Sequence, residues 1–152
     1  MKAVVQRAAR ASVRVDGAVV GEIGAGMLVL LGVMKGDGER ECDEMALKIA
    51  QFRFFPDQAG KMNLSALDLQ REVLVVSQFT LAADGSRGRR PSFDAAAPPA
   101  LAEPLYERFA QKLRALGLVV ATGRFGASMQ VDLVNDGPVT FVLEVNAGTA
   151  SG

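Results

Sequence analysis

Hydrophobic and polar residues partly alternate along the first part of the chain, as they do in strands with one buried face. This pattern covers residues 2–9 and 11–16, and Asp16-Gly17 is a strong two-residue hairpin signal that turns the chain back into 18–23. A nearly continuous apolar run over 27–33 is typical of a strand buried on both faces. The pattern therefore predicts three strands at the start of the chain.

Two later stretches show the spacing of amphipathic helices. The first covers about residues 38–52, with Asp37 placed to cap it, and the second covers about 99–116, with Gly117 placed to end it. Pro104 marks either the true start of the second helix or a kink, because proline removes an internal hydrogen bond. The two apolar stripes consist of Cys42, Met45, Ala46, Ile49 and Ala50, and of Leu101, Leu105, Phe109, Leu113 and Leu116.

The remaining segments predict short strands and loops. The central strand covers 72–81, where four consecutive apolar residues suit burial on both faces. A short strand is expected over 52–55. An ordered loop is expected over 61–70 and a long loop over 82–97. Three closing strands cover 118–122, 129–134 and 139–145, with a tight hairpin at 135–138 between the last two.

In chain order, these elements predict a single mixed α/β domain. It has three strands, two strand-and-helix pairs and three closing strands, with two helices packed on a sheet or barrel-like layer. A chain of 152 residues fits one such domain. We expect residues 1–145 to form it and the small, polar tail 146–152 to be frayed.

Composition excludes several kinds of chemistry. The chain has no histidine, which rules out Ser-His-Asp and Cys-His catalysis and the usual zinc centres. Its one cysteine, Cys42, lies on an apolar stripe, so we interpret it as part of the core. The net charge is zero, so binding to nucleic acid would need a local patch. There is no membrane-length apolar run and no signal-peptide core, which predicts a cytoplasmic protein.

Two polar clusters are candidates for function. Ser77, Gln78 and Thr80 directly follow the apolar run of the central strand. Polar groups at such a place either tie down the next loop or face a ligand. The second cluster, Arg87-Gly88-Arg89-Arg90, lies in the long loop and is typical either of a solvated loop or of a nucleic-acid patch.

The first polar cluster is part of a longer motif, Ser77-Gln78-Phe79-Thr80-Leu81. A second motif, Asn135-Asp136-Gly137-Pro138-Val139-Thr140, lies between the last two predicted strands and extends into the final one. With them, the sequence resembles the D-aminoacyl-tRNA deacylases of the D-tyrosyl type. The resemblance covers residues 1–145 with matching spacing. Further matches are Gln6-Arg7, Gly60-Lys61-Met62-Asn63-Leu64, Arg90-Pro91-Ser92-Phe93 and Thr122-Gly123-Arg124-Phe125.

The resemblance implies an enzyme that hydrolyses the ester between a D-amino acid and the 3′-terminal adenosine of tRNA. It also implies removal of glycine from mischarged tRNA-Ala. The expected protein is a homodimer that needs no metal or cofactor and has no membrane or DNA partner. Each active site is completed by Gly137-Pro138 of the other subunit, joined by a cis peptide bond. The catalytic residues that the resemblance implies are Ser77, Gln78, Phe79 and Thr80.

Hydrolysis without histidine is chemically reasonable, because an aminoacyl ester is already activated. Backbone N–H groups of the turn at 77–80 could stabilise the oxyanion that develops. Thr80 is a nucleophile by position, but no base is evident near it. The attacking group is therefore Thr80, a water, or a water placed by the 2′-hydroxyl of the terminal ribose. We favour the last of these.

Selectivity also has a physical interpretation. Two carbonyls at Gly137-Pro138 that hold the substrate's amino group would exclude the side chain of an L-amino acid and let glycine and D-residues pass. We expect Arg7 to brace the partner's Gly137-Pro138 through backbone carbonyls. We expect Arg87, Arg89 and Arg90 to contact tRNA phosphates.

Two other functions remain open. The first is a dimeric RNA-binding module with the same fold and no turnover. The second is a general esterase, which the lack of histidine and of a Gly-x-Ser-x-Gly elbow disfavours.

Overall fold

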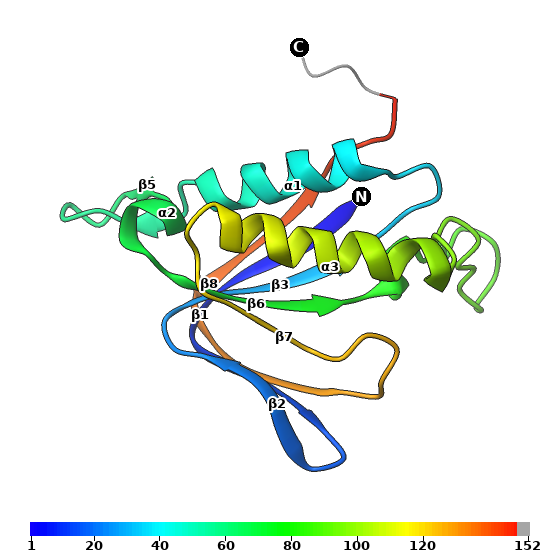
Figure 1. The fold of residues 1–152 in the computed structure, drawn as a ribbon, viewed down its shortest axis with the longest axis horizontal. Coiled ribbons are helices and arrows are strands. Elements are labelled where there is room, and N and C mark those ends of the chain that lie inside the picture. Colours follow the sequence, from blue (N-terminus) through cyan, green and yellow to red (C-terminus); the bar gives the residue numbers. More distant parts are fainter. Residues whose placement is uncertain (149–152) are drawn as a thin grey trace.

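The longest N-terminal element is β1 (Lys2–Val15), on which the sheet is built in the computed structural model, which describes residues 1–148. One edge of β1 pairs with β8 (Gln130–Glu144). The other edge pairs first with β3 (Gly26–Gly32) and then with β2 (Ala18–Ile23), all antiparallel (Figure 1). The two strands predicted over 2–9 and 11–16 are thus one strand, because pairing with β8 runs across the gap between them.

Three parallel strands continue the sheet, in the order β3, β6 (Glu72–Ser77) and β7 (Val120–Thr122). Alternate residues of β6 enter different cores: Val73 and Val75 pack in the larger core under the helices, and Leu74 and Val76 in a smaller core. This double burial explains the continuous apolar run and confirms the central strand. The strand ends at Ser77, however, and not at residue 81.

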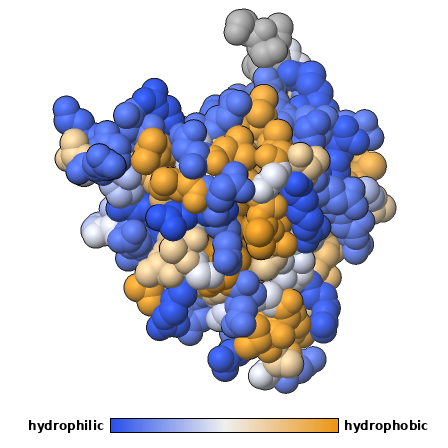
Figure 2. Space-filling view, turned by 60° about the vertical axis from the view of Figure 1, so that its left-hand side comes forward, coloured by the Kyte–Doolittle hydropathy of each residue, from blue (hydrophilic) through white to orange (hydrophobic). Residues whose placement is uncertain are grey.

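The smaller core is closed by β2, which folds over towards β6 and β7. Gly21 allows this approach, because a Cβ atom there would overlap the carbonyl oxygen of Thr122. The surface carries apolar patches among hydrophilic side chains (Figure 2). One patch lies at the lower end of the view, where β2 is found, and Val19 of β2 is exposed. The result is a nearly closed mixed sheet.

Two helices, α1 (Glu39–Gln51) and α3 (Pro99–Ala115), lie side by side on the other face of the sheet (Figure 1). Arg108 of α3 donates hydrogen bonds to both carboxylate oxygens of Asp43 in α1, at 2.8 and 2.9 Å. The predicted apolar stripes are buried or half-buried except for Leu101, which is 60% exposed. It lies in the first turn of α3, ahead of the point where the helix meets the core. The predicted mixed α/β class with helices on a barrel-like sheet is confirmed.

The ends of the two helices differ from the prediction. Gly38, not Asp37, is the N-cap of α1. The Asp37 carboxylate instead accepts a hydrogen bond from the Met34 N–H at 2.7 Å and pairs with the Met1 ammonium at 2.8 Å. Both charged groups of that pair are almost fully buried, and a buried charge requires its partner. Helix α3 begins at Pro99 and runs through Pro104, so Pro104 does not mark its start.

The segment predicted as a loop over 61–70 contains two short elements, β5 (Met62–Leu64) and α2 (Ala66–Leu69). Helix α2 is held by a capping box, in which the Ser65 hydroxyl accepts from the Asp68 N–H and the Asp68 carboxylate accepts from the Ser65 N–H. The strand predicted over 52–55 is reduced to β4 (Phe55–Pro56), which pairs with β5.

The hairpin predicted at 135–138 is wrong, because β8 is one strand of 15 residues. Gln6 of β1 pairs with Thr140 and Ala8 pairs with Asn135, so that residues 136–139 lie opposite Arg7 alone. We call residues 136–139 the β8 bulge. An extra segment in one strand leaves the pairing on both sides intact and turns its own backbone outward.

Beyond β8, the Val145 N–H donates to the Met1 carbonyl at 2.9 Å, and residues 147–148 form a turn. The tail predicted to be frayed covers 146–152, of which 149–152 lie outside the described residues. Within residues 1–148, no helix is both long enough and apolar enough to cross a membrane.

Candidate functional site

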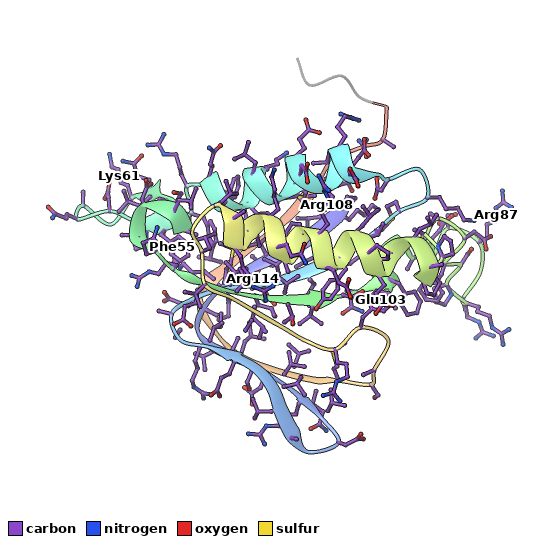
Figure 3. The ribbon with its side chains drawn as sticks, viewed as in Figure 1. Phe55, Lys61, Arg87, Glu103, Arg108 and Arg114 are labelled. Carbon is purple, nitrogen blue, oxygen red and sulfur yellow. The ribbon has the colours of Figure 1, made fainter. Side chains whose placement is uncertain are left out.

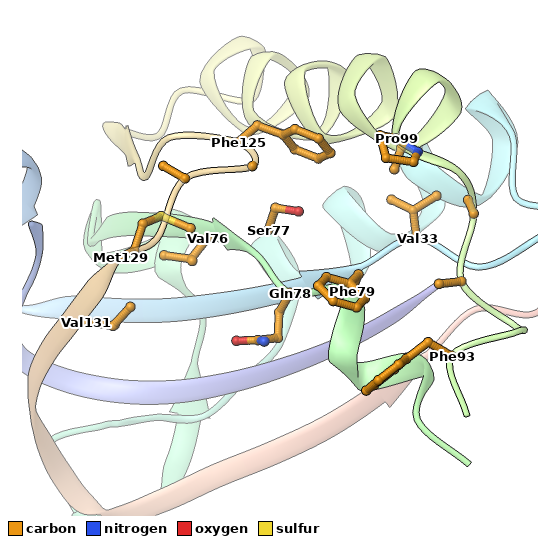
Figure 4. A pocket seen from close by; sticks show the side chains of 15 residues that line it. Val33, Val76, Ser77, Gln78, Phe79, Phe93, Pro99, Phe125, Met129 and Val131 are labelled. Carbon is orange, nitrogen blue, oxygen red and sulfur yellow. The ribbon is translucent and has the colours of Figure 1, made fainter. Parts of the chain in front are cut away.

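A cavity of about 580 Å³ opens where β6 ends, and we call it the β6 pocket (Figure 4). One wall is the end of β6 and the turn after it, a second is the loop before α3, and a third is the segment between β7 and β8. None of the lining residues is charged. They are Val33, Val76, Ser77, Gln78, Phe79, Phe93, Ala96, Ala97, Pro99, Ala102, Phe125, Gly126, Ala127, Met129 and Val131.

The turn after β6 is held tightly against β3. The Gln78 N–H donates to the Leu31 carbonyl at 2.8 Å, and the chain then enters a short 3₁₀ helix, η1 (Phe79–Ala82). A Cβ atom on Gly32 would lie 3.1 Å from the Gln78 carbonyl oxygen, so glycine provides the room for this contact. The strand end predicted to hold functional groups is therefore a rigid wall of the pocket.

Three of the four predicted catalytic residues line the β6 pocket, and Thr80 does not. The Thr80 side chain is exposed, and its hydroxyl accepts a hydrogen bond from the Gln78 amide. Phe79 is 58% exposed and packs edge-on against Phe93, with 5.3 Å between ring centroids. Both rings belong to the pocket lining, Phe79 from the turn after β6 and Phe93 from the loop before α3 (Figure 4).

The pocket offers backbone donors rather than titratable groups. The first N–H groups of a helix have no acceptor inside it. Within residues 1–148, the N–H groups of Phe79 and Thr80 donate to no other group. Phe79 lines the pocket beside Ser77 and Gln78, and Thr80 follows it just outside the lining. The chemistry that these donors can perform is orientation and stabilisation of developing negative charge.

The β8 bulge is braced from two sides. The Asn135 amide donates to the carbonyls of Arg7 and Val139 at 2.9 and 3.0 Å, and its oxygen accepts from the Val139 N–H at 3.2 Å. The Gly137–Pro138 peptide bond is cis. A Cβ atom on Gly137 would overlap the backbone nitrogen of Val139, so only glycine fits there. Residues 136–138 are nonetheless exposed, which makes the bulge a fixed projection.

Arg7 is engaged by its own chain. Its Nε donates to the Asp136 carbonyl at 2.8 Å and its Nη1 to the Phe54 carbonyl at 2.9 Å, and its side chain is 12% exposed. The sequence predicts that Arg7 braces the bulge of a partner. In the structure it braces the bulge of the same chain, one residue ahead of Gly137.

The β8 bulge is remote from the β6 pocket of the same chain. Ser77 pairs with Leu31 of β3, which pairs with Ala3 of β1, whereas the bulge lies opposite Arg7. Four residues of strand separate Ala3 from Arg7, or about 13 Å. The bulge residues are also absent from the pocket lining. The two groups of predicted site residues are therefore not brought together within one chain.

The arginine cluster lies on a separate hairpin-like loop. Asp84 and Ser92 pair through both backbone hydrogen bonds, at 2.8 and 2.9 Å, and close the loop at its base. Hydrogen bonds from Ser86 lower the pKa of the Asp84 carboxyl. Arg87, Arg89 and Arg90 are exposed at the tip, and Arg87 points away from the body of the protein (Figure 3). The chain returns from this loop to the pocket through Phe93.

Sequence reasoning missed the pocket walls opposite Ser77. Phe125 and Met129 come from the segment between β7 and β8, and Ala96 and Ala97 from the loop before α3. Phe125 belongs to the matched segment Thr122-Gly123-Arg124-Phe125, but that match assigned it no role. A further signal was the aromatic residue in a glycine-rich connection, Gly123-Arg124-Phe125-Gly126. Within residues 1–148, no group of three or more acidic or cysteine side chains is placed to hold a metal ion.

Residues 4–144 match the family model described as D-Tyr-tRNA(Tyr) deacylase. A D-aminoacyl-tRNA deacylase of Ruegeria pomeroyi is 57% identical over 145 residues, which cover 95% of this chain and 100% of that protein. One of Geotalea uraniireducens is 60% identical over 144 residues, covering 95% and 93%. The resemblance predicted from the two motifs is therefore confirmed.

Two solved structures share the fold. The structure of a protein named "c-Myc DNA Unwinding Element Binding Protein" has a TM-score of 0.92 at 45% identity, and the match covers 97% of this chain and 100% of that one. A second, of a probable eukaryotic D-amino acid tRNA deacylase, has a TM-score of 0.84 at 15% identity and covers 95% and 98%. The second likeness is one of fold alone.

Proposed function

The chain belongs to the D-Tyr-tRNA(Tyr) deacylase family, and on that premise we propose that it hydrolyses the ester bond of D-aminoacyl-tRNA, releasing free tRNA and the D-amino acid. The observation that carries this proposal is the β6 pocket. Its volume of about 580 Å³ lies within the usual range for small-ligand sites. Its apolar walls suit a nucleoside and the side chain of an amino acid. We place the reaction in the cytoplasm, where aminoacyl-tRNA is used.

The reaction requires water to add to the ester carbonyl carbon and the bond to the ribose 3′-oxygen to break, with a proton passing to that oxygen. The negative charge that develops on the carbonyl oxygen would be held by the N–H groups of Phe79 and Thr80. Such donors are effective because they are already oriented before the reaction starts. Ser77 and Gln78 would position the substrate in front of them.

The attacking group, in our proposal, is a water placed by the 2′-hydroxyl of the terminal ribose. No lining residue of the β6 pocket is charged, so the pocket wall supplies no general base. The Thr80 hydroxyl is turned to the Gln78 amide and is not part of the lining. A nucleophilic Thr80 would need a base that this arrangement does not provide.

The chiral filter, in our proposal, is the β8 bulge of a second copy of the chain. The bulge projects from its own subunit. It lies opposite Arg7, about 13 Å along β1 from Ala3, which is the residue of β1 level with Ser77 of the same chain. Carbonyl groups at Gly137 and Pro138 would accept hydrogen bonds from the substrate's amino group. An L side chain would then point into backbone, whereas glycine and D-residues would fit. The protein would also remove glycine from tRNA-Ala.

A homodimer follows from this arrangement, because each pocket would need a bulge from the other subunit. The outer edge of β8 supports it: within residues 1–148, β8 pairs with no strand other than β1, and Val134 and Val142 are exposed along it. Long, unpaired edges with exposed apolar residues are sites of association.

The tip of the 84–92 loop would contact the acceptor stem. Arg87, Arg89 and Arg90 are exposed there, and Phe93 joins the loop to the pocket mouth. Replacing all three by alanine should raise KM for D-Tyr-tRNA and flatten its salt dependence, because phosphate contacts release counterions. An unchanged KM at low salt would contradict this part of the proposal.

A second candidate is nucleic-acid binding without turnover. The solved structure that is 45% identical to this chain is that of a protein named for binding a DNA element. Binding of nucleic acid and hydrolysis of an aminoacyl ester both need a basic surface. Only hydrolysis also needs N–H groups next to a pocket that holds the ester.

The deciding experiment compares D-Tyr-tRNA and L-Tyr-tRNA, using metal-stripped protein and a Thr80→Ala variant. Rapid loss of the D-ester alone would support the deacylase, and retained activity in the variant would support attack by water. A terminal 2′-deoxyadenosine should abolish turnover if the 2′-hydroxyl places that water. Binding of tRNA with no loss of either ester would favour the second candidate.

A further inference from the structure

A second cavity, of about 350 Å³, lies between α3 and the segment that follows β7, and we call it the α3 cavity. Phe125 lines both this cavity and the β6 pocket. Its ring packs on Tyr106, with 5.8 Å between centroids, and Tyr106 is anchored by a hydrogen bond from its hydroxyl to the Val75 carbonyl at 3.1 Å. Phe125 therefore lies between the two cavities, with its ring held in place by Tyr106.

Four of the polar side chains that border the α3 cavity have no partners within residues 1–148. Glu103, Glu107 and Gln111 lie on α3, at intervals of four residues, and Arg124 lies across from them. All four are exposed, and within residues 1–148 none of their side chains makes a hydrogen bond or an ion pair. Arg114 completes the same side of the helix, where Glu103 also lies (Figure 3).

The contrast with the neighbouring face of α3 is informative. Arg108 and Lys112 face α1, and both pair with Asp43. The charges that face α1 are matched. Around the α3 cavity, Arg114 donates to the Val120 carbonyl at 3.0 Å, whereas Glu103, Glu107 and Arg124 are left available to a ligand.

The mixture of groups indicates the class of ligand. Two carboxylates beside the arginines disfavour a phosphate, because they repel its charge. A flat neutral ring with both donors and acceptors on one edge would suit the site. Cytosine has such an edge: its exocyclic amine donates to a carboxylate, and its ring nitrogen and carbonyl accept from arginine or an amide. Single-stranded bases are commonly held in this way, stacked on an aromatic ring.

We propose that the α3 cavity binds the cytosine of the nucleotide that precedes the terminal adenosine of tRNA. This inference rests on the proposed function, in which the terminal adenosine enters the β6 pocket on the other side of Phe125. Two adjacent nucleotides would then lie on either side of one ring. Because every tRNA ends in the same CCA sequence, this contact adds affinity for tRNA without distinguishing one tRNA from another.

The test uses three small substrates: D-tyrosine esterified to the 3′-end of adenosine, of CpA and of UpA. The wild type should hydrolyse the CpA ester with a kcat/KM about tenfold above that of the adenosine ester, as one good base contact provides. The UpA ester should lose this advantage, because uracil presents a carbonyl where cytosine has its amine. Arg124→Ala should bring the CpA-to-adenosine ratio close to one, and Lys48→Ala, on the exposed side of α1, should leave it unchanged.

Exchange of a single group sharpens the test. Glu103→Gln or Glu107→Gln replaces an acceptor by a side chain that can also donate, so at least one of them should raise the rate for UpA relative to CpA. Equal rates for the adenosine and CpA esters in the wild type would overturn the cytosine site alone. If no ester is hydrolysed, the proposed function fails, and calorimetry of unesterified CpA against UpA then tests the cavity: equal affinities overturn the cytosine site as well.

Discussion

The β6 pocket and the β8 bulge are opposite in shape and are stabilised in different ways. The pocket is concave, uncharged and built from three separate segments packed on the sheet. The bulge is convex and consists of one short segment, held by the side chains of Asn135 and Arg7. Neither is a complete site: the pocket has donors for an oxyanion but no group that distinguishes D from L, and the bulge has carbonyls but no cavity. In the function proposed above, catalysis and selection therefore belong to separate regions that would meet between subunits.

The largest effect should come from the bulge. A Cβ atom on Gly137 would overlap the backbone nitrogen of Val139, so Gly137→Ala must change the path of the bulge. We expect kcat/KM for D-Tyr-tRNA to fall on the order of 100-fold, as displacement of a positioning group by about 1 Å can cause. Gly24→Ala is the matched control, because a Cβ atom there comes no nearer to a neighbour than 4.0 Å, to the Glu72 carboxylate. Full activity in Gly137→Ala would show that the bulge has no role in the reaction.

Mixing two inactive variants should show in which subunit the bulge acts. Ala127→Trp fills the β6 pocket and leaves the bulge intact, whereas Gly137→Ala does the reverse. In a re-equilibrated mixture, half of the dimers are mixed, and each has one intact pocket facing one intact bulge. Roughly a quarter of wild-type activity should return. If the bulge served the pocket of its own chain, the mixture would be as inactive as its components.

Much of the fold could be predicted because its signals are local. The double burial of β6 appears as consecutive apolar residues, and the turn at Asp16-Gly17 as a dipeptide in which both residues have positive φ, 51° and 79°. The hairpin predicted at 135–138 was wrong for a related reason. A polar Asn-Asp-Gly-Pro segment is the same signal whether the next strand turns back or continues, and only pairing with β1 decides between them.

The candidate site was predictable in part. Ser77 and Gln78 follow a strand that the pattern identifies, so their place at its end was expected. The position of Phe125 opposite them depends on how β7 and α3 pack, which local sequence does not determine. The hydrogen-bond partner of Arg7 could not be predicted either. Asp136 is 129 residues away along the chain, and the two residues meet where the register between β1 and β8 shifts.

A smaller effect should follow from removing the brace of the bulge. Arg7→Ala would remove charge-assisted hydrogen bonds to the Asp136 and Phe54 carbonyls, and each such bond contributes about 1.5–3 kcal/mol. We expect the preference for D-Tyr-tRNA over L-Tyr-tRNA to fall about tenfold, because a looser bulge excludes L side chains less well. Arg10→Ala, on an exposed position of the same strand, is the control. Unchanged chiral selectivity would rule out a bracing role for Arg7.

The smallest effect should come from a change at Asp43 in α1. This residue pairs with Arg108 of α3 and does not line the β6 pocket. Hydrogen bonds from Arg108 lower the pKa of the Asp43 carboxyl. A depressed pKa in the folded state means that the pair stabilises the fold above the ordinary carboxyl value of about 4 and that this contribution is lost as pH falls through the lowered value.

Asp43→Asn should therefore reduce the free energy of unfolding by less than about 1 kcal/mol at pH 7, since the pair is partly exposed. The difference from wild type should begin to shrink as the pH falls below about 4, where the carboxyl of the unfolded chain takes up a proton, and should be gone below the lowered pKa of the folded protein. Glu22→Gln, an exposed carboxylate on β2, controls for net charge. Urea unfolding at both pH values gives the stability, and D-Tyr-tRNA hydrolysis gives the activity. A large drop in chiral selectivity in Asp43→Asn would mean that the losses in Gly137→Ala and Arg7→Ala reflect general loosening of the protein, whereas unchanged selectivity assigns them to the bulge.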